Sequence, residues 1–388
     1  MRAMDNFTFH NPVRLIFGQG QIAQIAKEIP AGARVLFAFG GGSIKTNGVH
    51  AQVVAALQAA GLFWLEFSGI EPNPRYETLM KAVHLARTEK LDFVLAVGGG
   101  SVADGCKFIA AAIPFDGEPW DILAKRARVN TATPLGIVLT LPATGSEMNC
   151  FAVVSRDETH EKLSFGSPAV WPKFSVLDPE STYTLPPRQI GNGIVDAFVH
   201  VVEQYLTYPA QAPLTDRMAE AILSTLVEIA PAAMSNPPDY QARANLMWCA
   251  AMALNGLVGA GVPQDWATHY IGHELTAIAG IDHARTLAAV WPGVMAVKFE
   301  AKKAKLAQYA ERVWNVHEGS VDDKARAAIA HTRAFFEQVG VPSGLAAYDL
   351  PADIADQVAA RLDARNQAPL GEHGDIDSAM VKRVLAAA

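Results

Sequence analysis

The stretch FVLAVGGGSVADGCKF, residues 93–108, decides the fold of this chain. A run of apolar residues without alternation leads into three glycines and a serine, and a helical pattern follows. A strand with this composition is buried on both faces, as in a parallel sheet that helices cover on both sides. The stretch therefore predicts one strand–turn–helix step of an α/β domain.

Similar apolar runs recur before and after this stretch, and helical patterns follow Asn47, Glu77 and Val102. Such alternation predicts βαβ units and a parallel sheet. The expected strands are Arg34–Phe39, Leu62–Phe67, Leu91–Val97, Leu135–Leu139 and Phe174–Leu177.

Two segments depart from this alternation. Residues 151–165 have a polar centre between apolar ends, which predicts a hairpin or a long loop beside the sheet. Residues 6–18, NFTFHNPVRLIFG, alternate at first and contain Pro12, which favours a strand at the sheet edge because proline has no N–H to donate. A free edge near Phe7–Phe17 invites pairing with a second copy, so we expect a homodimer.

The sequence changes character at residues 183–188, where two prolines precede a long helical pattern. We expect a dinucleotide-binding α/β domain over residues 1–185 and an all-helical domain over residues 186–388, with the active site in the cleft between them. The longest apolar stretch, Leu246–Val262, contains Asn255 and several glycines. It predicts a buried core helix rather than a membrane span.

The composition excludes several classes of protein. With 32 Lys and Arg against 39 Asp and Glu, the net charge is −7, so no basic excess favours nucleic acid. Half of the residues are apolar, which is unlike a disordered chain. The first residues contain no apolar secretion signal, and Cys106, Cys150 and Cys249 form no CxxC pair. We therefore expect a cytoplasmic protein without structural disulfides or a membrane partner.

The glycines of the opening stretch, Gly98–Gly100, allow backbone amides and Ser101 to approach a phosphate at the start of a helix. Gly98, Gly100 and Ala103 fit the loose G-x-G-x-x-A dinucleotide pattern. A turn that serves the chain geometry alone is the alternative. A P-loop is excluded, because Cys106 stands where its lysine must follow the glycine.

A second glycine loop follows the first expected strand and contains Gly40, Gly41, Gly42, Ser43 and Lys45. No acidic residue follows this strand closely to bind the ribose hydroxyls of NAD. Amides, a hydroxyl and a lysine suit the additional 2′-phosphate of NADP. A flexible turn without a ligand is the alternative.

Histidines gather in the second half of the chain. Asp196 and His200 are one helical turn apart, and His269, His273 and His283 lie within 15 residues. The spacing of four is typical of metal ligands, although surface ion pairs share it. Imidazoles in apolar surroundings lack water and need a partner, which a cation would supply; satisfied core histidines are the alternative.

Other catalytic patterns fail. The segment HELTA begins like the zinc motif H-E-x-x-H, but Ala277 takes the second histidine position. Ser146 lies in ATGSEMN rather than in a G-x-S-x-G nucleophile elbow. Cys150 has no activating base nearby in the sequence, so we interpret it as a packed thiol.

With these motifs the chain resembles the iron-containing (group III) alcohol dehydrogenase family, and within it the NADPH-dependent broad-specificity aldehyde reductases, also called butanol dehydrogenase-like. The resemblance covers essentially the whole chain and implies a Rossmann-like parallel sheet domain followed by an all-α domain, the dehydroquinate synthase-like architecture. Its motifs are RLIFGQG, IEPNPRYET, AVGGGSVADGCKFIA, LTLPATGSEMN, VLDP, TLPPRQIGNGIVDAFVHVVEQY and GAGVPQDWATHYIGHELTAIAGIDHARTLA.

The same resemblance implies one divalent ion, iron or zinc, held by Asp196, His200, His269 and His283. It places His273 close to the substrate, as a candidate catalytic proton relay or as an orienting residue.

For the cofactor, many family members have an aspartate where this chain has Gly40, a departure that also favours NADPH. The implied NADP(H)-binding residues, besides the first glycine loop, are Asn73, Gly98, Gly99, Gly100, Ser101, Asp104, Thr140, Thr144, Ser146 and Lys162.

The expected function is reversible hydride transfer between NADPH and an aldehyde or primary alcohol, with the metal polarising the carbonyl. Three alternatives stay open at this point. They are an NAD-dependent alcohol or polyol dehydrogenase, a lyase of the dehydroquinate synthase type, and a nucleotide-binding regulatory protein that has lost catalysis.

Overall fold

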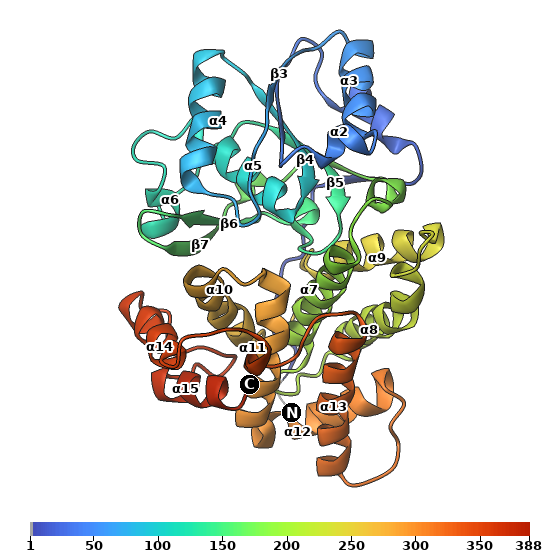
Figure 1. Cartoon of the computed structure of the whole chain (residues 1–388), viewed down its shortest axis with the longest axis vertical. Coiled ribbons are helices and arrows are strands. Elements are labelled where there is room, and N and C mark those ends of the chain that lie inside the picture. Colours follow the sequence, from blue (N-terminus) through green and yellow to red (C-terminus); the bar gives the residue numbers. More distant parts are fainter. Residues whose placement is uncertain (1–2) are drawn as a thin grey trace. The chain divides into compact units, whose positions relative to one another are not determined.

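A computed structural model describes residues 3–388, and within them the chain forms two compact units. The sheet unit consists of residues 10–185 and 238–251. The helical unit consists of residues 186–237, residues 252–388 and the segment that ends at Phe9. Figure 1 traces the chain through the elements of each unit.

The core of the sheet unit is a parallel sheet, six-stranded within the described residues, in the order β1-β8-β5-β4-β2-β3. All five expected strands are confirmed, with β3 at the edge of the sheet, and β4 continues two residues into the glycine loop. The predicted edge strand is confirmed only over residues 14–17. The strands are β1 (Arg14–Phe17), β2 (Arg34–Phe39), β3 (Phe63–Phe67), β4 (Phe93–Gly99), β5 (Leu135–Leu141) and β8 (Phe174–Leu177).

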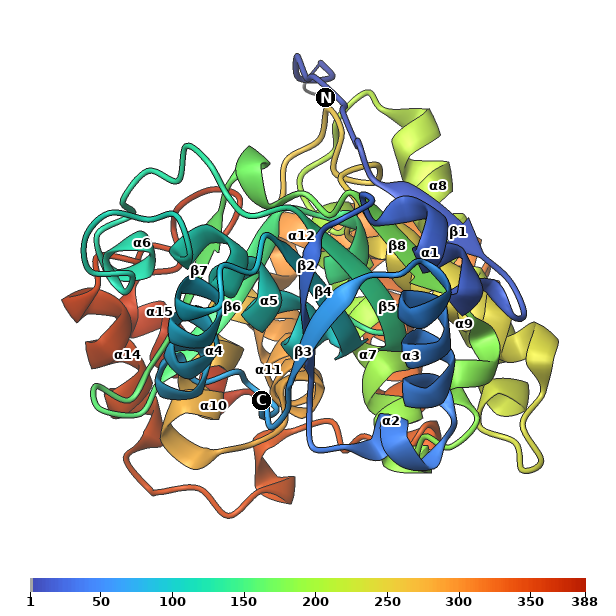
Figure 2. The same ribbon diagram turned by 90° about the horizontal axis from the view of Figure 1, so that it is seen from above.

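Helices cover both faces of this sheet. Helix α3 (Val49–Ala59) packs in one apolar cluster with Val35 and Phe37 of β2, while α4 (Tyr76–Thr88) and α5 (Gly100–Ala112) pack in another with Leu36 and Ala38. Figure 2 shows α4 and α5 on one side of β2 and β4, and α3 on the other. Alternate residues of a strand point to opposite faces, so burial of both faces explains the apolar runs without alternation.

The predicted hairpin is confirmed as the antiparallel pair β6 (Phe151–Arg156) and β7 (Glu161–Gly166). Gly166 lies opposite Phe151, and a Cβ there would lie 2.5 Å from the Phe151 ring. The cross-strand aromatic side chain therefore requires glycine at this position.

The helical unit confirms the predicted all-helical character; the described residues form no extended strand there, although isolated bridges occur, as between Leu370 and Ile376. Helix α7 has Pro187 in its first turn, where a missing N–H costs nothing. The helices are α7 (Pro187–Tyr205), α8 (Pro213–Ala233), α10 (Ala267–Ala279), α11 (His283–Val297), α12 (Phe299–Val313), α13 (Val321–Gln338), α14 (Ile354–Ala364) and α15 (Ser378–Ala386).

The predicted core helix over Leu246–Val262 is wrong in its second half. Helix α9 (Tyr240–Ala253) ends because the Asn255 side chain accepts a hydrogen bond from the backbone N–H of Leu257 at 3.0 Å and Gly256 adopts a φ of 92°. Both features form a turn that a helix cannot continue through.

Most of α9 belongs to the sheet unit, although it follows helices of the other unit in the sequence. Arg243 donates to the backbone oxygen of Thr182 at 2.6 Å, and the rings of Trp248 and Phe17 are 6.2 Å apart. None of the helices in residues 3–388 combines the length and apolar character that a membrane crossing needs.

Candidate functional site

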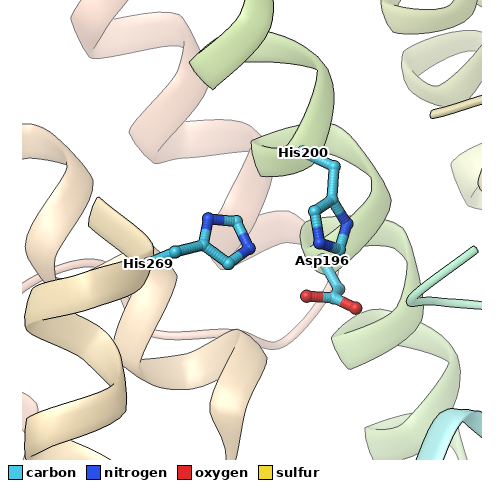
Figure 3. Close-up of side chains that lie close together, drawn as sticks. All are labelled: Asp196, His200 and His269. Carbon is cyan, nitrogen blue, oxygen red and sulfur yellow. The ribbon is translucent and has the colours of Figure 1, made fainter. Parts of the chain in front are cut away.

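Helices α7 and α10 bring three of the predicted ligands together. Asp196 and His200 lie one turn apart on α7, and His269 lies on α10. One potential ligand atom from each residue lies within 4.8 Å of the other two, and all three side chains are buried. Figure 3 shows the carboxylate and both imidazoles pointing toward one another. Carboxylate oxygen and imidazole nitrogen are donors that suit iron and zinc, so the site fits a divalent ion.

The remaining two histidines lie beside this group. His283 is the first residue of α11, and its Nε2 is 3.7 Å from Asp196 Oδ1. His273 lies one turn after His269 on α10, with its ring 5.0 Å from the His283 ring and 6.3 Å from the His269 ring. The structure thus places all five residues of the sequence-predicted metal and catalytic set in one cluster, which we call the metal cluster.

A glycine on α10 allows the histidines of α10 and α11 to meet. A Cβ added at Gly272 would lie 2.8 Å from Thr286 Oγ1 of α11, closer than real Cβ atoms come. The two helices therefore approach more closely than a larger residue would permit, and the rings of His269 and His283 come within 5.2 Å.

The electrostatics of the metal cluster favour neutral imidazole. Burial lowers the pKa of His200 well below its ordinary value, and nearby His269 lowers it further. Neutral imidazole is the form that binds a metal ion, so this environment keeps His200 ready as a ligand.

Sequence reasoning missed Glu203, which lies two turns after Asp196 on α7. Its carboxylate contacts Nδ1 of His269 and accepts from the backbone N–H of Thr268 at 2.7 Å. Burial and the negative charge of Asp265 raise the pKa of Glu203, while the Thr268 N–H opposes that rise. The spacing of seven residues from Asp196 was the available signal, because it places both side chains on one helix face.

Helix α10 starts from a strained residue. Trp266 has a φ of 65°, a left-handed conformation that costs a bulky residue on the order of 1–3 kcal/mol. Asp265 secures the turn by accepting from the Ala267 N–H at 2.9 Å and by pairing with Lys302 at 2.8 Å. The Trp266 ring lies 5.2 Å from the His269 ring, so the turn also covers one side of the metal cluster.

In the sheet unit, the loop at Gly98–Gly100 lies at the carboxyl end of β4 and the start of α5. A Cβ at Gly100 would lie 2.4 Å from the Thr144 side chain. A purely structural role of the turn, the alternative considered from the sequence, therefore accounts for Gly100 whether or not a phosphate binds. Ligands of open α/β sheets nevertheless bind at this edge, outside the carboxyl ends of the strands.

Behind this loop lies a largely buried set of polar residues that we call the Lys107 cluster: Asp104, Lys107, Ser146 and Asn149. Lys107 Nζ donates to Ser146 Oγ at 2.8 Å, to Asn149 Oδ1 at 3.0 Å and to the Phe151 backbone oxygen at 2.7 Å. Ser146 in turn donates to Asp104 Oδ1 at 2.6 Å. Two predicted cofactor residues thus depend on Lys107, which sequence reasoning missed.

Burial shapes the charges in and beside the Lys107 cluster. It lowers the pKa of Lys107 to about 8, against the raising effect of Asp104. It raises the pKa of neighbouring Glu147 to about 7. Neither carboxylate oxygen of Glu147 has a hydrogen-bond partner among the described residues. The Lys107 ammonium group thus has three hydrogen-bond acceptors that offset its burial. Glu147 has no such partners in the described part of the chain, and burial favours the neutral form of its carboxyl group.

The structure brings three further predicted cofactor residues together. Lys162 donates to Asn73 Oδ1 at 2.9 Å, and the Asn73 N–H donates to Ser101 Oγ at 3.3 Å. Thr144 accepts from the Ser146 N–H at 3.2 Å, and Thr140 is buried near the end of β5.

The first glycine loop is more open than the second. Gly41 and Gly42 have no atom within 4 Å of an added Cβ, and Gly42 has a φ of 99°. Gly40 is not left-handed, and its Cβ would lie 3.2 Å from the Ile70 backbone oxygen.

An acidic residue does stand near this loop, but it comes from the neighbouring strand. Lys45 pairs with Glu66 of β3 at 3.3 Å, and His50 contacts the same carboxylate at 2.8 Å. The absence of an acid after the first strand therefore describes the sequence but not the whole surroundings of Lys45.

Both halves of the chain match one protein family. Residues 12–179 match iron-containing alcohol dehydrogenase, and residues 191–388 match the C-terminal region of the Fe-containing alcohol dehydrogenase family. The chain is 55% identical to the NADPH-dependent aldehyde reductase YqhD of Escherichia coli strain K12, over 99% of this chain and 100% of that protein.

A further relative and a solved structure extend this likeness. The chain is 43% identical to the probable NADH-dependent butanol dehydrogenase 1 of Bacillus subtilis strain 168, over 92% of this chain and 93% of that protein. A crystal structure of E. coli K-12 YqhD superposes with a TM-score of 0.98 and 54% identity, and each chain is covered over 100% of its length. The fold and both halves of the sequence therefore indicate the same family.

Proposed function

Because this chain belongs to the iron-containing alcohol dehydrogenase family, we propose that it is an NADPH-dependent aldehyde reductase that interconverts aldehydes and primary alcohols. The observation that carries the proposal is the convergence of Asp196, His200 and His269 within 4.8 Å, in a chain 55% identical to a relative of that activity. Family membership disfavours the dehydroquinate synthase-type lyase and the regulatory protein considered from the sequence.

The proposed metal ligands are Asp196, His200, His269 and His283. An ion bound there would supply Lewis acidity that stabilises negative charge developing on the carbonyl oxygen. The Asp196 carboxylate would offset part of the ion's positive charge, and the imidazoles would bind it in their neutral forms. Contact between His283 Nε2 and the Asp196 carboxylate, at 3.7 Å, supports its place as the fourth donor.

His273 is the candidate proton relay. Reduction of an aldehyde consumes one hydride and one proton, so a group near the ligands must deliver the proton to the alcohol oxygen. His273 is half-buried, and its ring lies 5.0 Å from the His283 ring, a position from which it could exchange a proton beside the proposed ligands.

For the cofactor, NADPH would supply the hydride, and the chain would supply its orientation. We propose that Gly98, Gly99, Gly100, Ser101 and Asp104 contact its pyrophosphate and nicotinamide portions. Asn73, Thr140, Thr144, Ser146 and Lys162 would line the rest of the site, and Gly40–Ser43 would hold the 2′-phosphate.

NADH is the second candidate cofactor, and two observations favour testing it. The Bacillus subtilis relative is described as NADH-dependent, and Glu66 pairs with Lys45 beside the first loop. A 2′-phosphate would have to draw Lys45 away from that carboxylate. The open glycines and Ser43 support NADPH instead, because an amide or hydroxyl donates to a phosphate without repelling it.

We further propose a homodimer that works in the cytoplasm. Strand β1 forms one edge of the sheet and ends at Phe17, whose exposed ring lies 6.2 Å from the exposed ring of Trp248. Its backbone groups can pair with a second copy. The three cysteines are free, as a reducing compartment favours. Light scattering that finds only a 41.5 kDa species at micromolar concentration would contradict the dimer.

The decisive experiment measures NADPH oxidation by an aldehyde series that includes butanal, on protein of defined metal content. NADPH oxidation that depends on both the aldehyde and a bound ion supports the proposal. The same assay with NADH decides between the cofactors. Metal-loaded protein that oxidises neither cofactor with any aldehyde would overturn the function.

A further inference from the structure

We propose that Glu203 is a positioning residue that fixes the tautomer of His269 and thereby sets the affinity of the metal cluster. This inference rests on the metal centre proposed above. It assigns Glu203 a role that acts through the imidazole of His269.

The geometry starts from the chemistry of imidazole. A neutral histidine carries one proton, on Nδ1 or Nε2, and only the nitrogen without it can bind a metal ion. Nδ1 of His269 contacts the Glu203 carboxylate. The Glu203 oxygen at this contact can accept the Nδ1 proton, so the contact favours the tautomer that carries it and leaves Nε2 as the donor to an ion.

Glu203 is itself held rigidly. It lies on α7, the helix that also carries Asp196 and His200, and only 3% of its surface is exposed. One of its oxygens accepts from the Thr268 N–H at 2.7 Å, and its backbone oxygen accepts from the Asp265 N–H at 2.9 Å. The His269 ring is thus aligned with the other two ligands by a group on their own helix.

The two oxygens of Glu203 serve two N–H groups, one on Thr268 and one on His269. This double use suggests a sharp test, because an amide has only one acceptor oxygen. In Glu203→Gln, either the Thr268 N–H faces an amide NH₂ group, or that NH₂ group faces Nδ1 of His269. The second arrangement favours the tautomer whose proton sits on Nε2, which blocks metal binding.

The experiment measures the affinity of the full-length protein for Zn²⁺ and Co²⁺ by competition with a chromophoric chelator, without any turnover assay. We expect Glu203→Gln to weaken binding by about 10- to 100-fold. Glu203→Asp keeps two acceptor oxygens on a side chain one methylene shorter, so its affinity should lie between those of the wild type and the amide variant.

A matched control is Glu220→Gln. Glu220 is also a buried glutamate of the helical unit, 6% exposed, and it accepts from Tyr205 at 2.8 Å and Arg312 at 2.9 Å. This control should lose thermal stability but keep the wild-type metal affinity, because Glu220 has no contact with a proposed ligand among its described partners. A purely structural role of Glu203 predicts the same pattern for both amide variants.

The outcomes separate this inference from the proposed function. Wild-type protein that binds neither ion overturns the metal centre itself. Tight binding by both the wild type and Glu203→Gln overturns only the role of Glu203. Should Glu203→Gln fail to fold, Glu203→Asp decides: affinity equal to the wild type with a lowered melting temperature contradicts the proposal, and reduced affinity supports it.

Discussion

The metal cluster of the helical unit and the Lys107 cluster of the sheet unit are both buried and polar, yet they balance charge in different ways. Lys107 places its ammonium group on three oxygen acceptors, and the Ser146 hydroxyl links it to the Asp104 carboxylate. The metal cluster instead gathers a carboxylate and imidazoles whose acceptor atoms converge within 4.8 Å.

The two clusters differ in the source of their positive charge. The Lys107 cluster contains its own cation, so its geometry is complete in the chain alone. The metal cluster concentrates lone pairs, which is favourable only when a cation from outside joins them. Loss of a side chain from the metal cluster should therefore affect metal binding, and loss of a side chain from the Lys107 cluster should affect protein stability.

The largest expected effect comes from His269→Ala, which removes one donor of the metal cluster. Loss of a primary ligand should abolish stoichiometric metal binding, and turnover should fall by about 10³-fold because the Lewis acid is lost. NADPH affinity, measured by fluorescence titration, should not change, since the Lys107 cluster is intact. Unchanged metal content and rate would sink the ligand assignment.

The reciprocal variant is Lys107→Met, which removes the internal cation of the other cluster. Asp104 then loses the positive charge of Lys107 and keeps only the weaker influence of Lys162, and breaking a buried pair costs about 3–5 kcal/mol. We expect a lower midpoint of denaturant unfolding and weaker NADPH binding, while metal stoichiometry by mass spectrometry stays at the wild-type value. Loss of metal comparable with that of His269→Ala would break the comparison between the clusters.

Within the metal cluster, His273→Ala separates proton transfer from metal binding. A lost general acid lowers turnover by about 10²-fold or more, whereas the ion should remain bound at wild-type stoichiometry. The pH dependence of turnover should also flatten. If this variant loses its metal as completely as His283→Ala does, then the roles of the two histidines are exchanged.

On the cofactor side, Gly40→Asp tests whether the first loop rather than the Lys107 cluster selects the phosphate. An aspartate there repels a 2′-phosphate, so the KM for NADPH should rise at least about tenfold more than the KM for NADH. The ratio is the readout, because the new Cβ lies 3.2 Å from the Ile70 oxygen and any resulting shift affects both cofactors. Equal kinetic efficiency of the wild type with NADH and NADPH would show that this loop does not select the 2′-phosphate.

The smallest effect concerns Glu147, the carboxyl beside the Lys107 cluster that has a pKa raised to about 7 by burial. A folded-state pKa above the unfolded value means that its favourable contribution is complete below about pH 4.5 and is lost as the pH rises through 7. Glu147→Gln keeps the neutral shape. It should therefore exceed the wild type in unfolding free energy at pH 8 by about 1–3 kcal/mol, with little difference at pH 4.5. An identical pH dependence in both proteins would show that Glu147 is ionised without cost.

The sequence was most informative about the strands, because burial on both faces leaves a continuous apolar run whose ends are sharp. Arg34–Phe39 and Phe174–Leu177 match their predicted bounds fully. It was less informative about helix ends. Asn255 and Gly256 look like tolerable interruptions within an apolar stretch, and only the hydrogen bond to the Leu257 N–H reveals the turn.

For the candidate site, spacing on one helix predicted the pairs that meet, Asp196 with His200 and His269 with His273. Partners from another element could not be predicted in the same way. A glutamate on a helix, such as Glu203, is unremarkable until His269 is placed against it. Glu66 reaches Lys45 only because β3 lies beside β2. The sequence of a strand does not show which strand will lie next to it.

Residues 238–251 belong to the sheet unit although they follow part of the helical unit in the sequence, and this order affects folding during synthesis on the ribosome. A chain that has emerged as far as residue 185 already holds every strand of the parallel sheet, yet it lacks α9 and therefore the partners of Thr182 and Phe17. Asp5 finds its partner later still, because its backbone N–H donates to the backbone oxygen of Gly261 at 3.0 Å. Vectorial folding from the N-terminus can thus begin with the sheet but cannot finish it. A gene fragment that stops at residue 185 should yield a protein prone to aggregate, whereas one that reaches past residue 261 supplies both late partners.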